Sequence, residues 1–181
     1  MSQSRISSFF ERVDLLEIRL CILLNNSSQQ AFIRLLFRII SRLGDGIFWY
    51  LLAALLPYLH GKQGFEQAIH IFMTGLIVLA IYKLLKAKLI RERPFISCDT
   101  IKQAAPALDQ YSFPSGHTMH ACSFAILFSY YLPELAPTVW GFAGLVAISR
   151  VILGLHYPTD VMAGALLGSI VAFLSLLVIT E

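Results

Sequence analysis

The sequence predicts an all-α integral membrane bundle of about five membrane-crossing helices, preceded by amphipathic helices at its N-terminal end. Of the 181 residues, 57% are hydrophobic and 14% are charged, whereas a soluble domain has about 45–50% apolar and about 25% charged residues. Several apolar segments also follow one another, and each approaches the roughly 20 residues that a membrane-spanning helix needs. Lipid is therefore the predicted solvent for most of the chain.

Five apolar segments are the candidates for membrane-spanning helices. The first, residues 47–59, is short and rich in aromatic side chains, so it needs flanking residues to span the bilayer. The others are residues 68–85, 118–132, 137–155 and 161–179. Between the first two segments, His60-Gly61-Lys62 predicts a turn, because glycine there interrupts the apolar pattern.

Residues 1–46 differ from the rest because charges interrupt their apolar segments. These charges begin with Glu11, Arg12, Asp14, Glu17 and Arg19, and then Arg34, Arg38 and Arg42 recur every four residues on one side of a helix. Each arginine at the bilayer centre costs roughly 2.5–3.5 kcal/mol. We therefore expect amphipathic helices lying in the membrane interface. A packing face against the bundle is the alternative, and a sixth span results if this region inserts.

We expect a single membrane domain over residues 1–181. Residues 1–46 form its N-terminal helices, residues 47–181 form its catalytic core, and Gly44-Asp45-Gly46 breaks the helix between them. Five crossings bring chemically active residues to one face of the bundle: Lys86, Arg93, Ser115, His117, His156 and Asp160. The apolar pattern alone does not require this convergence, so it indicates a site.

Positive charges at that face predict a phosphate site. Lys86 and Arg93 follow the second span, and Arg150 lies inside an apolar segment, where an ionisable residue normally faces a polar cavity. A guanidinium group binds two oxygens of a phosphate at once.

The stretch Pro114-Ser115-Gly116 adds backbone donors to the predicted site. Pro114 suits the first turn of a helix, and Ser115 and Gly116 would then offer free amides to an anion at the positive end of the helix dipole.

Two histidines supply candidate catalytic groups. His156 precedes Asp160 by four residues, and a carboxylate on one imidazole nitrogen fixes the tautomer and leaves the other nitrogen free to attack. His117 can donate a proton to the departing oxygen as a general acid.

Three segments of the chain resemble the signature motifs of the type 2 phosphatidic acid phosphatase family. They are KAKLIRERP, PSGH and SRVILGLHYPTD, and they occur in the family's order and spacing between residues 86 and 160. The resemblance implies a phosphatase that needs neither metal nor cofactor and forms a phosphohistidine. It makes His156 the nucleophile, Asp160 its orienting partner and His117 the leaving-group acid. The resemblance also implies a set of phosphate-binding residues: Lys86, Arg93, Ser115, Gly116 and Arg150.

The implied partners are a lipid phosphate or diphosphate, water and the bilayer, with no nucleic acid; the oligomeric state is not indicated. Undecaprenyl pyrophosphate is favoured, because the chain resembles the short bacterial family members that recycle this carrier. Phosphatidylglycerol phosphate, phosphatidic acid and lipid A phosphate are alternatives. Two other classes are a non-catalytic lipid carrier or flippase, and a metal hydrolase built on His117, His120, His156 and Asp160.

The orientation in the membrane is predicted in two opposite ways. The resemblance implies a bacterial cytoplasmic membrane with the site facing the periplasm or the exterior. Every Lys and Arg except Lys62 falls on the side of the site, and the positive-inside rule would place that side in the cytoplasm. We follow the resemblance, because several of these cations belong to the site or to interfacial helices and bias the count.

Overall fold

The computed structural model describes residues 2–180, with side chains from residue 15 to residue 179, and contains no β-strand in that part. In chain order the elements are α1 (Ser2–Ser27), α2 (Ala31–Arg42), the π-helical turn η1 (Leu43–Ile47), α3 (Phe48–Lys88), α4 (Pro94–Ser97), α5 (Gly116–Tyr131), the 3-10 turn η2 (Pro133–Leu135), α6 (Ala136–Ile152) and α7 (Pro158–Thr180). The all-α prediction is confirmed. The side chains of Glu11, Arg12 and Asp14 lie outside the described part.

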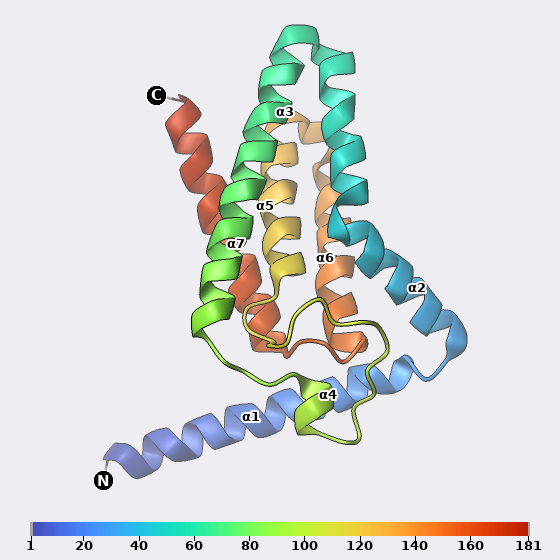
Figure 1. Ribbon diagram of the computed structural model, residues 1–181, viewed down its shortest axis with the longest axis vertical. Coiled ribbons are helices and arrows are strands. Elements are labelled where there is room, and N and C mark those ends of the chain that lie inside the picture. Colours follow the sequence, from blue (N-terminus) through green and yellow to red (C-terminus); the bar gives the residue numbers. More distant parts are fainter. Residues whose placement is uncertain (1, 181) are drawn as a thin grey trace.

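Helix α3 is a hairpin of two antiparallel arms (Figure 1). Gly61 separates the arms with φ of 57° and ψ of −127°, a conformation that glycine tolerates because it lacks a Cβ. Beside this turn, a Cβ on Gly64 would collide with the carbonyl oxygen of Leu56 in the other arm. The turn predicted at residues 60–62 is therefore present, and the second arm extends beyond the predicted residues 68–85.

The predicted break at Gly44-Asp45-Gly46 is present as a kink between α2 and the first arm of α3. Gly46 has φ of 138°, which side-chain-bearing residues rarely adopt, so the two helices meet at a non-helical residue within η1. Here the turn carries Asp45, whose carboxylate contacts His117 at the start of α5.

Three segments of the described chain are long and apolar enough to cross a membrane: Ala31–Lys88, Pro133–Ile152 and Pro158–Ile179. The first folds back at Gly61 and so contributes both arms of α3. Helix α5 has 16 residues. It lies at the centre of the bundle, in contact with α3, α6 and α7. The five apolar segments predicted from the sequence thus form one bundle.

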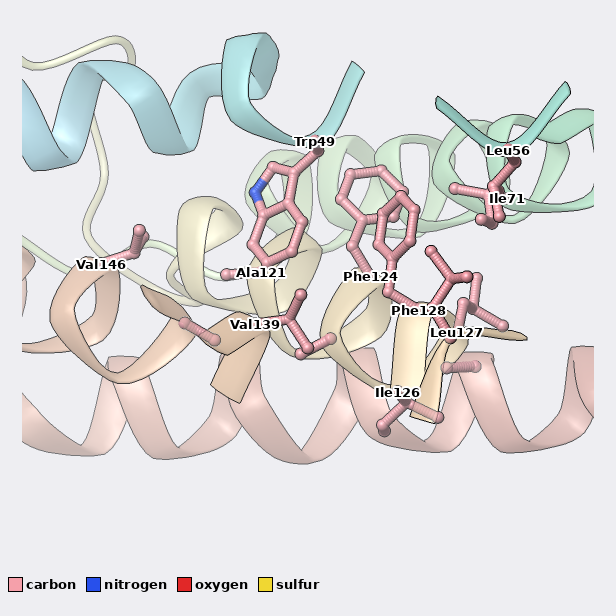
Figure 2. Close-up of a cluster of buried hydrophobic side chains, with 14 of the residues drawn as sticks. Trp49, Leu56, Ile71, Ala121, Phe124, Ile126, Leu127, Phe128, Val139 and Val146 are labelled. Carbon is pink, nitrogen blue, oxygen red and sulfur yellow. The ribbon is translucent and has the colours of Figure 1, made fainter. Parts of the chain in front are cut away.

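Aromatic side chains fill the centre of this bundle. Trp49 of α3 lies against Phe124 and Phe128 of α5, with ring centroids 5.6 and 6.1 Å away (Figure 2). Val139 of α6 is fully buried in the same cluster. Because most side chains of α5 between Thr118 and Phe128 are buried, this helix and the residues at its N-terminus are held in a fixed position.

Helices α5 and α7 approach each other closely through two glycines. A Cβ on Gly164 would lie 2.5 Å from the carbonyl oxygen of Ser115, and one on Gly168 would lie 2.0 Å from that of Met119. Small residues let membrane helices pack backbone to backbone. This contact aligns the start of α7, which carries Asp160, with the start of α5, which carries His117.

Helix α1 lies across the end of the bundle, next to α4 and the loops (Figure 1). Its inward side is mixed, with Glu17 and Asn25 buried beside Cys21, and with Ile18 and Ile22 packed against the same apolar cluster as Cys21. Its outward side exposes large apolar residues: Leu15, Leu16, Leu20 and Leu23. An amphipathic helix with its apolar side outward suits the membrane interface. Helix α1 packs on the bundle through both polar and apolar contacts, as the second alternative predicts, and its outward leucines leave the interfacial location a prediction.

Gly168→Ala should destabilise the protein, because the added Cβ meets the backbone of Met119 rather than a movable side chain. Overpacking of this kind costs about 1–3 kcal/mol, so we expect a lower midpoint of thermal unfolding in detergent. The matched control is Gly144→Ala, where a Cβ would meet nothing within 4 Å and where alanine favours the helix. Equal midpoints for the two variants would contradict the proposed close packing.

Candidate active site

The turn between α6 and α7 presents His156 at the end of the bundle. Gly154, with φ of 74°, ends α6 in the left-handed conformation that commonly closes a helix. The amides of Leu155 and His156 then donate to the carbonyl oxygen of Arg150 at 3.0 and 3.1 Å. Pro158 begins α7 directly afterwards, so His156 is held between two helix ends.

Asp160 lies in the first turn of α7 and faces His156. Its carboxylate is fully buried, and Oδ2 accepts the backbone N–H of Tyr157 at 2.8 Å. The same oxygen is 3.6 Å from Nδ1 of His156, which makes no hydrogen bond within the described part. The predicted pairing of His156 with Asp160 is thus present as a close electrostatic contact, at a distance longer than a hydrogen bond.

The predicted cation Arg93 lies on the other side of the His156 ring. Nη1 of Arg93 lies 3.4 Å from Nε2 of His156. Burial, together with the positive charges of Arg150, Arg93 and Lys86, holds the pKa of His156 well below its ordinary value. The imidazole is therefore neutral at physiological pH, which is the form that carries a free lone pair.

Asp109 compensates two of these cations, a role that the sequence did not reveal. Its Oδ2 lies 3.5 Å from Nζ of Lys86 and 3.9 Å from Nη2 of Arg93. The hydroxyl of Tyr82 donates to the same oxygen. Asp109 comes from the loop between α4 and α5. Its carboxylate contacts two of the cations that are predicted to hold phosphate.

Arg150 keeps part of its hydrogen-bonding capacity unused. Its Nη1 donates to the hydroxyl of Ser41 in α2, whereas its buried Nε makes no hydrogen bond within the described part. The guanidinium borders a cavity of about 500 Å³. The polar residues around that cavity are Arg38, Ser41, Arg42, Asp45, His117 and Arg150. An anion in this cavity could be bound by several donors.

The start of α5 differs from the prediction in two respects. The helix begins at Gly116, with Ser115 as its N-cap, so Pro114 precedes the first turn rather than lying in it. The amide of Ser115 is also not free, because it donates to the carbonyl oxygen of Asp160 at 3.0 Å. Gly116 is required by packing, since a Cβ there would meet the ring of Tyr82. The backbone donors for an anion therefore begin at Gly116.

His117 is paired with a second carboxylate, that of Asp45. The sequence predicts only a helix break at Gly44-Asp45-Gly46 and no role for Asp45 in the site. A single acid between two glycines is the feature that could have indicated one. The two side chains border the same cavity as Arg150. The site therefore contains two histidine–carboxylate pairs.

The four residues considered for a metal site do not converge. His156 faces Asp160, His117 faces Asp45, and Nδ1 of His120 lies 3.0 Å from the carbonyl oxygen of Gly116. No cluster of three or more His, Cys, Asp or Glu side chains suited to a metal occurs in the part of the chain that is described. This geometry does not support the metal-hydrolase alternative.

Arg91 and Glu17 extend the site toward α1, and neither was predicted. Arg91 donates from Nη1 to Oδ1 of Asp160 at 2.7 Å and from Nη2 to Oε2 of Glu17 at 2.6 Å. Two features of the sequence could have identified them: Arg91 is a further cation in KAKLIRERP, and Glu17 is an acid within an apolar part of α1. The carboxylate that faces His156 is thus itself held by a cation.

Comparisons with known proteins agree with this arrangement. Residues 67–181 match the PAP2 superfamily. The undecaprenyl-diphosphatase of Sulfolobus acidocaldarius is 32% identical over 152 residues, which make up 83% of this chain and 72% of that protein. The phosphatidylglycerophosphatase B of Bacillus subtilis is 34% identical over 120 residues, 55% of each chain. The crystal structure of Aquifex aeolicus LpxE superposes with a TM-score of 0.76 at 26% identity, covering 89% of this chain and 94% of that chain.

The matched region contains the three motif-like segments, the second arm of α3 and helices α5 to α7. Its relatives are named as phosphatases of lipid phosphates and diphosphates. The chain therefore belongs to the PAP2 superfamily and is a membrane phosphatase.

Proposed function

We propose that the protein hydrolyses a lipid diphosphate through a phosphohistidine on His156, with undecaprenyl pyrophosphate as the leading candidate substrate. The observation that carries this proposal is the two-sided environment of the His156 ring. Asp160 faces Nδ1, and Arg93 lies beside Nε2. A neutral imidazole that faces a carboxylate on one side and a phosphate-binding cation on the other suits nucleophilic attack on a bound phosphate.

In the first step Nε2 of His156 attacks the terminal phosphorus. A P–N bond forms, the bond from phosphorus to the leaving oxygen breaks, and His117 gives its proton to that oxygen. Asp160 stabilises the positive charge that develops on the His156 ring. Lys86, Arg93 and Arg150 stabilise the charge on the phosphoryl oxygens as the bonds exchange.

In the second step water attacks the phosphohistidine. His117, now neutral, accepts a proton from the water, the P–N bond breaks, and inorganic phosphate leaves. The His156 ring regains its lone pair, and His117 regains the proton that it gave up. The cycle consumes one water molecule and requires no further reactant.

A lipid chain has an apolar path next to His117. A cavity of about 280 Å³ borders His117 and Gly116, and a second cavity of about 110 Å³ lies deeper between the arms of α3 and α5. Both are bordered by apolar and aromatic side chains, and they share four residues: Tyr50, Leu79, His120 and Phe124. This arrangement supports a substrate whose headgroup is at His156 and whose tail leads away past His117.

The charges near His117 support a diphosphate in particular. Arg38 and Arg42 of α2 border the same cavity as His117 and Arg150. A leaving group that departs on the His117 side therefore enters a cationic environment. A polyprenyl phosphate carries negative charge when it leaves, whereas a protonated lipid alcohol does not. The names of the Sulfolobus and Bacillus relatives are consistent with diphosphate and phosphomonoester lipids, respectively.

Phosphatidylglycerol phosphate, phosphatidic acid and lipid A phosphate remain alternative substrates for the same chemistry. A lipid carrier without catalysis would need the cations but not a histidine held by a carboxylate. The pairing of His156 with Asp160 therefore favours the enzyme.

His156→Ala and His117→Ala should fail in different ways. Without His156 no phosphoenzyme can form, so turnover of both p-nitrophenyl phosphate and phosphatidic acid should be lost. Without His117 the loss should be about 10²–10⁴-fold on phosphatidic acid, whose alkoxide needs a proton, and much smaller on the aryl phosphate. Turnover of both substrates and acid-quenched trapping of labelled phosphoenzyme provide the measurement. A phosphoenzyme that survives in His156→Ala would overturn the assignment.

Arg42→Gln should lower the preference for diphosphate lipids. Removing a charge-assisted contact to the leaving phosphate should reduce kcat/KM for a polyprenyl diphosphate by about 10-fold and leave a monophosphate lipid nearly unchanged. The matched control is Arg34→Gln, two turns earlier on α2, because Arg34 borders a different cavity. Equal losses on both substrates in Arg42→Gln would argue against diphosphate selectivity.

We further propose that the site faces the periplasm or exterior of a bacterial cytoplasmic membrane. The positive-inside count is weakened because Lys86, Arg93 and Arg150 are buried in the site, and Arg91 bridges two carboxylates. Cations whose positions are required by the proposed site or by folding are poor indicators of membrane orientation.

The orientation can be measured with single cysteines at the two ends of the bundle. In a cysteine-free background, Asp99→Cys lies in the loop before α5 and Lys62→Cys lies beside the turn of α3; both positions are exposed. In intact cells a membrane-impermeant maleimide should label position 99 and leave position 62 unlabelled until the cells are lysed. The reverse pattern would place the site in the cytoplasm.

A further inference from the structure

Glu17 joins the interfacial helix α1 to the first turn of α7. It is 5% exposed, and all its polar contacts go to groups near the site. Its Oε1 accepts from the amide of Thr159 at 2.8 Å and from the Thr159 hydroxyl at 2.6 Å. Its Oε2 accepts from Nη2 of Arg91 at 2.6 Å. A buried carboxylate with three donors is held in one orientation.

Arg91 connects Glu17 with Asp160. One end of its guanidinium contacts Glu17, and Nη1 at the other end donates to Oδ1 of Asp160 at 2.7 Å and to Oγ1 of Thr159 at 2.8 Å. The group also lies over the ring of Tyr157, 4.0 Å from its centroid. The planar fork of arginine can bridge two carboxylates in a way that a lysine cannot.

These contacts determine how Asp160 faces His156. Oδ1 of Asp160 is engaged by Arg91, so Oδ2 is the oxygen directed at the Tyr157 amide and at Nδ1 of His156. A rotation of this carboxylate would move the charge away from the imidazole. Fixing Oδ1 therefore fixes the contact on which the orientation of His156 depends.

Helix α1 also holds the far side of the His156 turn. Nδ2 of Asn25 donates to the carbonyl oxygens of Ile152 and Lys102, both at 2.9 Å, and its Oδ1 accepts the Lys102 amide at 2.8 Å. Sγ of Cys21 lies 4.0 Å from the carbonyl oxygen of His156. The inner side of α1 thus contacts the His156 turn both before and after the histidine.

We propose that Glu17 and Arg91 are positioning residues for the nucleophile, acting through Asp160. The inference rests on the proposed roles of His156 and Asp160. It goes beyond them by assigning α1 a part in catalysis: the helix whose outer side presents leucines orients the catalytic carboxylate from its inner side. A merely structural Glu17 would anchor α1 without affecting the chemical step.

Glu17→Gln and Arg91→Gln should lower kcat by about 10–100-fold, because a small misplacement of a catalytic group is costly, and should change KM by less than about threefold. Arg91→Lys should recover part of the loss, since it restores the charge beside Asp160. The matched control is Glu92→Gln, an exposed acid next to Arg91 whose side chain contacts Ser97. That variant should keep the parental kcat. Folded protein is quantified for each variant by size exclusion in detergent.

The decisive measurement repeats Glu17→Gln in an Asp160→Asn background. If Glu17 acts through Asp160, the second substitution should cost less than about twofold there, whereas independent effects multiply. Full multiplication, a change in KM alone, or unchanged kcat in Glu17→Gln would overturn the inference. If Glu17→Gln yields no folded protein, Arg91→Lys is tested in the same two backgrounds by the same criterion. Full activity of His156→Ala would instead refute the proposed function itself.

Discussion

The positive charges buried around one neutral imidazole are the constraint on which the rest of the site depends. Lys86, Arg93 and Arg150 are each less than a tenth exposed, and burying an unpaired ion costs several kcal/mol even after relaxation. The proposed role of these cations in binding phosphate requires that they are not fully neutralised. The structure balances them partially, with Asp109 contacting two of them at 3.5 and 3.9 Å.

The field of these cations also acts on the proposed nucleophile. It lowers the pKa of His156 and keeps the ring neutral, but it would oppose the positive charge that the ring acquires in the proposed attack on phosphorus. A buried carboxylate on the opposite nitrogen offsets this opposition. Because Asp160 is itself buried, it needs donors of its own, and Arg91 and the Tyr157 amide supply them. The polar network therefore extends outward until it reaches α1.

The bundle and half of the site could be predicted from the sequence, because both depend on local patterns. The length of each apolar segment predicts a helix, Gly61 predicts a turn, and the four-residue spacing of His156 and Asp160 predicts their pairing. Each of these patterns involves residues that are close together in the sequence. The acids that pair with cations at the site, Asp109 and Glu17, could not be predicted, because the tertiary fold determines which cations they contact. Glu17 and Arg91 are 74 residues apart, and neither belongs to a periodic pattern. The prediction of a free Ser115 amide is wrong, because the close packing of α5 on α7 depends on glycines whose contacts appear only in three dimensions.

The two histidine–carboxylate pairs differ in burial, and the difference matches what each histidine would have to do. The side chains of His156 and Asp160 are 3% and 0% exposed, whereas those of His117 and Asp45 are 10% and 40% exposed. A nucleophile must be oriented and kept from competing water, so its carboxylate is best buried and fixed. A residue that gives a proton to a leaving group and then takes one from water must reach solvent in every cycle. Its carboxylate partner can therefore be exposed to solvent. The kink at Gly46 places Asp45 at the border of the cavity, where its carboxylate is partly exposed and still contacts His117.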